Sequence, residues 1–114
     1  MTPELKQKWI AALRSGEYRQ GRGRLRRYYS AAINEFCCLG VLCNIVDPEG
    51  WEMPRRPGPG PYAISHRGTG GAPSQQVQKN IGLEDVQIER LIFLNDTGNQ
   101  TFKEIADYIE KEIK

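Results

Sequence analysis

The chain has 114 residues, of which 39% are hydrophobic and 26% charged, and its formal net charge is +2. This length fits a single domain over residues 1–114 with a modest core. The longest apolar run covers residues 36–46, which is too short for a membrane-spanning helix of about 20 residues, and no signal-peptide pattern opens the chain. We therefore expect a cytoplasmic protein that does not cross a membrane.

The charge is unevenly distributed along the chain. Residues 1–30 hold eight Lys and Arg against two Glu, a net of +6, whereas residues 83–114 hold eight Asp and Glu against four Lys and Arg, a net of −4. The basic part can meet an acidic partner or the chain's own acidic end.

The first predicted element is a helix over residues 3–15. Thr2 can cap it, Pro3 suits the first helical position, and Glu4 favours the positive end of the helix dipole. Ser15-Gly16 is a typical helix end. Apolar side chains recur at helical spacing on one face: Leu5, Trp9, Ala12 and Leu13.

The next stretch is rich in arginine, with five in the nine residues 19–27: Arg19, Arg22, Arg24, Arg26 and Arg27. We expect a strand at about residues 23–28, where Arg22, Arg24 and Arg26 share one face. Gly21 and Gly23 let a neighbour or a ligand approach the backbone closely. A return segment leading to Phe36 would complete a hairpin that packs against the first helix.

This stretch has two interpretations. Arginine forms bidentate bonds to phosphate, and the following Tyr28 and Tyr29 can stack on a base, so the pattern predicts an anion site for a nucleotide, a nucleic acid or an acidic protein surface. The alternative is a solvated strand face that pairs with the acidic C-terminal helix.

The apolar run predicts a short buried helix over residues 37–46. Its apolar residues follow helical spacing, Gly40 leaves room for a close neighbour, and Asp47-Pro48 ends the helix. A buried strand is the alternative, because short apolar runs are ambiguous.

The run also holds the three cysteines, Cys37, Cys38 and Cys43. Their odd number argues against a disulfide scaffold, and they lack the Cys-x2-Cys pairs of a zinc site, so we expect no metal and no cofactor. Free cysteines are usually small buried hydrophobic residues. The alternative is a nucleophilic Cys37 or Cys38, with His66 as base and Asn95 or Asp96 orienting it.

Residues 47–73 predict an irregular loop, since 12 of the 27 are Gly or Pro. We expect no helix and no central strand here, although Tyr62–Ser65 can form a short edge strand. His66 is expected to be a solvated loop residue, with a ligand contact as the alternative.

Two helices are predicted at the end of the chain, over residues 84–94 and 102–113. Thr101 and Glu104 form a capping box for the second, and Asn95 and Asp96 belong to a turn between the two. The elements together predict a small α+β domain: an N-terminal helix, a basic β-hairpin, a buried central helix and two C-terminal helices.

Three segments of the chain share a pattern with a known group of proteins. They are residues 12–26 (ALRSGEYxQGxGxLR), residues 36–43 (FCCLGVLC), and LNDxG at 94–98 followed by FxEIAxxIE at 102–110. The set resembles a family of small proteins, mostly of unknown function, that tailed bacteriophages and prophages encode. The resemblance implies a viral accessory protein that acts in the bacterial cytoplasm.

From these observations we expect a non-enzymatic protein that counters host defence by sequestering a phosphorylated signal or blocking a defence protein. The expected binding residues are Arg19, Arg22, Arg24, Arg26, Arg27, Tyr28, Tyr29, His66 and Asn95. A nucleic-acid-binding module is the first alternative, and a cysteine enzyme is the second. Formation of a homo-oligomer stays open.

Overall fold

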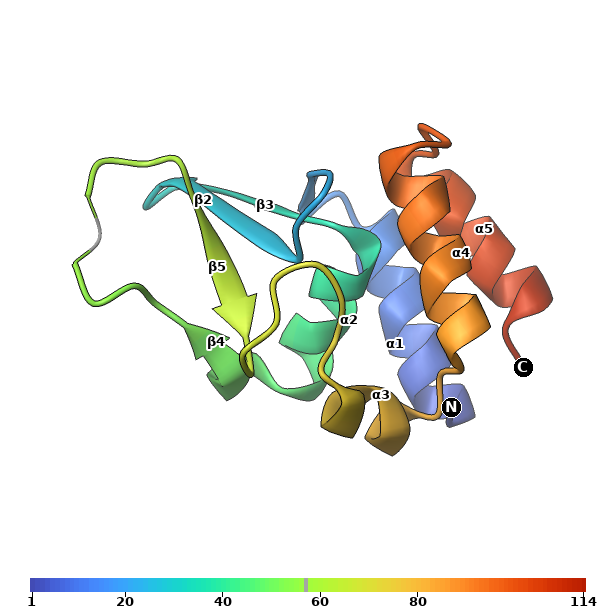
Figure 1. Cartoon of the computed structure of the whole chain (residues 1–114). Helices are drawn as coiled ribbons and strands as arrows, with labels where there is room; N and C mark the ends of the chain where they lie inside the picture. Colours follow the sequence, from blue (N-terminus) through green and yellow to red (C-terminus); the bar gives the residue numbers. More distant parts are fainter. Residues whose placement is uncertain (57) are drawn as a thin grey trace.

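The sheet and most of the helices lie at opposite ends of the molecule in the computed structural model, which describes residues 1–56 and 58–114 (Figure 1). The helices within these residues are α1 (Pro3–Arg14), α2 (Cys38–Val46), α3 (Gln75–Ile81), α4 (Asp85–Asp96) and α5 (Phe102–Glu112), with a 3-10 turn at Pro48–Gly50. The fold is α+β, as the sequence predicts.

The described strands form one mixed sheet in the order β1-β3-β2-β5-β4. They are β1 (Arg19–Gln20), β2 (Arg26–Ser30), β3 (Ile33–Phe36), β4 (Trp51–Glu52) and β5 (Tyr62–His66). β2 pairs antiparallel with β3 and β5, β4 pairs antiparallel with β5, and β1 runs parallel to β3. The central strand β2 therefore carries four of the expected binding residues: Arg26, Arg27, Tyr28 and Tyr29.

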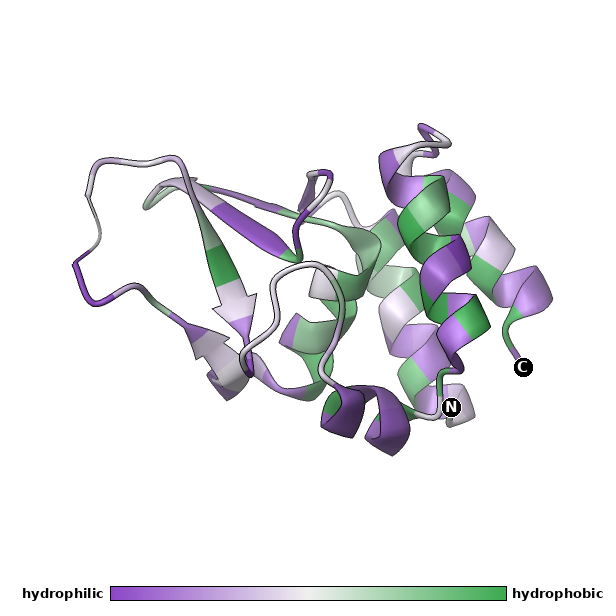
Figure 2. Ribbon diagram, viewed as in Figure 1, coloured by the Kyte–Doolittle hydropathy of each residue, from purple (hydrophilic) through white to green (hydrophobic). Residues whose placement is uncertain are grey.

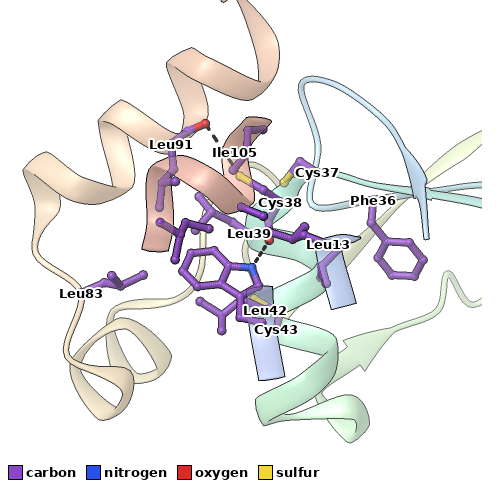
Figure 3. Close-up of a cluster of buried hydrophobic side chains, with 14 of the residues drawn as sticks. Leu13, Phe36, Cys37, Cys38, Leu39, Leu42, Cys43, Leu83, Leu91 and Ile105 are labelled. Atoms are coloured by element: carbon purple, nitrogen blue, oxygen red, sulfur yellow. Dashed lines mark hydrogen bonds between the residues drawn. The ribbon is translucent and has the colours of Figure 1, made fainter. Parts of the chain in front are cut away.

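Helix α2 is the centre of the hydrophobic core, between the sheet and the other helices (Figure 1). Its first six residues, 38–43, are buried, and Figure 2 shows it as a mostly hydrophobic ribbon. The indole Nε1 of the fully buried Trp9 donates to the carbonyl of Cys38 at 2.9 Å, and the Cys38 thiol lies 3.8 Å from the carbonyl of Leu91 (Figure 3). These contacts fix α1 and α4 to the first turn of α2.

Gly40 makes the closest approach in this core. A Cβ atom added there would overlap the carbonyl oxygen of Leu25, which is itself fully buried. The backbone of Leu25 also accepts from the amide of Cys37 at 3.2 Å. The absence of a side chain at residue 40 thus lets the segment before β2 lie directly on α2.

The long helices agree with the sequence prediction. α1 begins at a Thr2 cap, whose hydroxyl accepts from Leu5 N at 3.2 Å, and α2 ends at Asp47, before Pro48. The capping box of α5 is present, with Thr101 N donating to Glu104 Oε1 at 3.0 Å. α4 continues through Asp96, so Asn95 lies in a helix and the prediction of a turn there is wrong.

The predicted position of the basic strand is wrong. β2 begins at Arg26, and residues 22–25 form a bend before it, so Arg22 and Arg24 do not share a strand face with Arg26. The hairpin to Phe36 is present, but it packs mainly on α2 because α2 lies between the sheet and α1.

The segment 47–73 contains more regular structure than its composition predicts. It holds a 3-10 turn and β4, and β5 lies between β2 and β4, so the expectation of an edge strand is wrong. Arg67, which follows β5, has a positive φ of 48° and holds Asp47 by two hydrogen bonds of 2.7 and 3.0 Å. The ion pair holds the start of the segment at Asp47, and the pairing of β5 with β2 holds the segment near its end.

We predict that Gly40→Ala strongly destabilises the protein. In a helix interior, alanine is by itself more stable than glycine by about 0.5–1 kcal/mol. The overlap with a buried backbone oxygen outweighs this, and we expect a loss of about 2 kcal/mol or more in the free energy of unfolding, measured with urea. The control is Gly71→Ala, in an exposed bend with no atom near the added Cβ, which should change stability by less than about 0.5 kcal/mol. Equal stabilities of the two variants would contradict the close contact.

Candidate functional site

The arginine-rich stretch is divided between the two faces of the sheet. Strand residues alternate between faces, and the register aligns Arg27 with Glu35 and Ala63, whereas Arg26 aligns with Phe36 and Ile64. Because Phe36 and Ile64 are buried, we call the face with Arg26 the inner face and the face with Arg27 the outer face. Tyr28 and Tyr29 likewise lie on opposite faces.

On the outer face, Arg19 and Arg27 lie beside the carboxylate of Glu35. Arg19 aligns with Glu35 and its Nε lies 3.8 Å from the Glu35 carboxylate, while the hydroxyl of Tyr29 donates to the same carboxylate at 3.1 Å. Arg27 forms no ion pair within the described residues. Glu35 therefore compensates only part of the positive charge.

The remaining two arginines lie on the loop between β1 and β2. Arg22 and Arg24 are exposed, and neither forms an ion pair with a residue that the structure describes. The loop backbone is nevertheless held, because Leu25 N donates to Gly70 O at 2.7 Å and Gly21 N donates to Phe36 O at 2.8 Å. The loop thus presents two arginine side chains from a fixed backbone.

A buried hydrogen-bond network, the Gln20–Asn95 network, fixes this loop to the helices. Asn95 is fully buried, and its Oδ1 accepts from Gln20 Nε2 at 3.0 Å and from Cys38 N at 3.2 Å. Its Nδ2 donates to Gly21 O at 2.8 Å and to Asp96 Oδ1 at 2.9 Å. Every donor and acceptor of this amide is used within the fold, so we do not retain Asn95 as a ligand contact.

The same network reaches the loop and the start of α5. Asp96 Oδ1 accepts from the amide of Gly23 at 3.0 Å. Gln20 donates to Gln100 O at 2.8 Å, and its Oε1 accepts from Phe102 N at 3.1 Å. The network joins β1, the β1–β2 loop, α2, α4 and α5, and the roles of Gln20 and Asp96 in it were not predicted from the sequence.

Arg26 on the inner face has an unusual environment. Its guanidinium carbon lies 5.2 Å from the ring centre of Phe36 and 5.3 Å from that of Trp51, and its Nε donates to Asn34 Oδ1 at 3.0 Å. Burial lowers the pKa of Arg26, and its interaction with Tyr62 opposes that effect. The side chain is half-buried and forms no ion pair within the described residues.

A pair of tyrosines lies next to Arg26 along the inner face. The rings of Tyr28 and Tyr62 are stacked with centres 4.8 Å apart and planes 18° apart, and both side chains are half-buried. The sequence singled out Tyr28, but the contributions of Tyr62 and Trp51 depend on the pairing of β5 with β2 and β4 and were missed.

His66 is fully buried, so the interpretation as a solvated loop residue is wrong. Its Nε2 lies 2.8 Å from Asp47 O, and its ring packs edge-on against Trp51 with centres 4.8 Å apart. A Cβ at Gly50 would overlap the ring. His66 is therefore a packing residue between β5 and the 3-10 turn, and we do not retain it in the candidate site.

The cysteines are buried in the core. Burial raises the pKa of Cys37 to about 11 and that of Cys43 to about 12, and it raises the pKa of Cys38 well above its usual value. Cys37 caps α2, with its sulfur accepting from Gly40 N at 3.3 Å. A thiol with a raised pKa is a poor nucleophile at neutral pH, so this environment disfavours the cysteine-enzyme hypothesis.

A cleft of about 610 Å³ lies elsewhere, between the end of α2 and α3. It is lined by Val46, Asp47, Arg67, Ser74, Gln76, Val77, Asn80 and Ile81. Arg67 is the one arginine in this lining, and it is paired with Asp47. The arginines of residues 19–27 thus lie outside this cleft.

The acidic C-terminal helix α5 forms ion pairs with an arginine outside residues 19–27. Arg14 at the end of α1 contacts Asp107 at 2.7 Å and Glu110 at 3.4 Å, both on α5. The described ion pairs include none between α5 and residues 19–27. The arginine-rich stretch is therefore not neutralised by the acidic end of the described chain.

Within residues 1–56 and 58–114, no group of three or more His, Cys, Asp or Glu side chains is arranged to hold a metal ion. None of the described helices is long and apolar enough to cross a membrane.

The protein is a small α+β domain that carries arginines on both faces of its sheet and on the β1–β2 loop. The chain belongs to a family described as a domain of unknown function (DUF8296), whose model matches residues 1–113. Neither a curated protein nor a solved structure matches the chain.

We predict that iodoacetamide does not label the folded protein near neutral pH within the time that it labels all three cysteines of the urea-unfolded chain. Burial limits access, and the raised pKa values leave almost no thiolate in the folded state. Mass spectrometry of the intact protein counts the labels. Rapid labelling of one cysteine in the folded protein would restore the nucleophile hypothesis.

Proposed function

We propose that this protein is a non-enzymatic binding protein that blocks an acidic protein surface with its arginines. The arginine surface consists of Arg19 and Arg27 on the outer face and Arg22 and Arg24 on the β1–β2 loop. Tyr29, which is 40% exposed, adds an aromatic side chain of the kind that interfaces favour.

The observation that carries this proposal is the lack of internal compensation. Glu35 is the one described carboxylate that pairs with the arginine surface, at 3.8 Å from Arg19, and the acidic α5 pairs with Arg14 instead. Exposed and uncompensated charge of one sign attracts a partner of the opposite sign and accelerates association.

The shape of the surface supports a protein partner over a sequestered nucleotide. A small ligand needs a concave site that covers most of its surface. The arginine surface lies outside the 610 Å³ cleft and is spread over a sheet face and a loop, an arrangement suited to a broad partner.

We propose further that the partner is a defence protein of a bacterial host and that binding blocks it. Support for this step comes from the resemblance of residues 12–26, 36–43 and 94–110 to small phage and prophage proteins. The proposal places the protein in the cytoplasm of the host.

The test is a pull-down from a nuclease-treated bacterial lysate, with wild-type protein and two matched variants as baits. Arg22→Glu/Arg24→Glu reverses two loop charges, and Lys103→Glu/Lys114→Glu reverses two exposed charges at the other end of the chain. We expect an acidic protein to be captured by the wild type and the lysine variant, and to be reduced about tenfold or more with the arginine variant.

Equal capture by all three baits, or no capture by any, would contradict the proposal. Capture that occurs only from a lysate without nuclease treatment and falls steeply with salt would favour the nucleic-acid alternative. A nucleotide detected by mass spectrometry after heat denaturation of the purified protein would favour sequestration of a small phosphorylated molecule.

A further inference from the structure

We propose that Arg26, Tyr28 and Tyr62 form an anchor site on the inner face that receives one carboxylate, from an aspartate or glutamate side chain of the protein partner. This inference rests on the proposed function, because it assigns to that partner a specific contact separate from the arginine surface.

Arg26 is a half-buried cation without a counter-charge among the residues that the structure describes. Its guanidinium packs over Phe36 and Trp51, and Asn34, which is uncharged, accepts from its Nε at 3.0 Å. Partial desolvation of a charge is unfavourable unless the charge is paired, and rings and one amide offset it only in part. An incoming carboxylate would complete the pairing.

The outer edge of the Arg26 guanidinium, formed by Nη1 and Nη2, is available to a ligand. Within the described residues, Nη1 and Nη2 make no hydrogen bond, and neither is among the buried polar atoms that lack a partner, so both are accessible to solvent. These two nitrogens form the edge that binds a carboxylate with two parallel hydrogen bonds.

The tyrosines supply the rest of the site. Tyr28 lies two residues along β2 from Arg26, Tyr62 is the partner of Tyr28 on β5, and neither tyrosine hydroxyl is hydrogen-bonded to a described residue, so both are free to donate to a carboxylate oxygen. Figure 1 places the start of β5 at the end of the sheet farthest from α4 and α5. A partner can therefore reach the stacked rings without displacing these two helices.

The charge of the site favours a carboxylate over a phosphate group. Arg26 is the one Arg or Lys among the described inner-face residues that pair across β2, β3, β5 and β4. One guanidinium neutralises a carboxylate, whereas a phosphate monoester carries a charge of about −1.5 to −2 at pH 7. The excess charge would be partly buried against aromatic rings, which is unfavourable.

The anchor can be tested on the isolated protein with three probes: benzoate, its neutral isostere benzamide, and phenyl phosphate. Side-chain NMR signals of Arg26 Nε–H and Trp51 Nε1–H report on the site, because the Trp51 ring lies 5.3 Å from the guanidinium. We expect saturable shifts with benzoate, weaker binding of phenyl phosphate, and no comparable shift with benzamide.

Two adjacent substitutions provide the matched comparison. Arg26→Lys keeps the charge but removes the bidentate edge, and we expect it to weaken benzoate binding about fivefold or more. Arg27→Lys, on the opposite face, should change it by less than about twofold. Tyr62→Phe, which removes only a hydroxyl, should also weaken binding and gives a second test if Arg26→Lys does not fold.

Several results would overturn the anchor: no saturable shift with benzoate, equal shifts with benzamide, tighter binding of phenyl phosphate, or equal effects of Arg26→Lys and Arg27→Lys. Failure of the anchor and failure of the proposed function give different results. If the anchor is wrong, the probes fail while Arg22→Glu/Arg24→Glu still reduces capture. If the function is wrong, capture is unaffected by charge reversal while benzoate still binds at Arg26.

Discussion

The Gln20–Asn95 network is the interaction on which the arrangement of this surface depends. The amides of the buried Asn95 and the half-buried Gln20 donate all four of their side-chain hydrogens, and their bonds join the loop after β1, the first turn of α2, the end of α4 and the start of α5. Loss of one partner would leave buried polar groups unpaired, at a cost of about 1–3 kcal/mol for each group. The network therefore fixes the backbone from which Arg22 and Arg24 project, while the side chains stay in solvent.

Much of the helical structure could be predicted because its signals are local. Thr2, Asp47-Pro48 and the Thr101/Glu104 box mark helix ends through contacts over a few residues, and the structure confirms them. Helix α3 was missed because its sequence, QQVQKNI, has only two buried apolar residues. Its boundary signals were nevertheless present, since Ser74 caps it and Gly82 ends it with a φ of 77°.

The sheet was predicted less well because strand register is a long-range property. The spacing of Arg22, Arg24 and Arg26 suggested one common face, but the contact of Leu25 with Gly40 holds residues 22–25 out of the strand. β5 follows a Gly- and Pro-rich segment and still becomes an inner strand through its pairing with β2. The same pairing brings Tyr62 beside Tyr28 and buries His66, which no local pattern indicated.

Amide hydrogen exchange tests most directly the claim that a buried network holds the arginine loop in place. The amides of Gly23, Cys38 and Phe102 donate to Asp96, Asn95 and Gln20, respectively. The account predicts that all three exchange far more slowly than in an unstructured peptide, with Gly23 protected although it lies in an exposed loop. Exchange of Gly23 and Phe102 at the rate of an unstructured chain would contradict it.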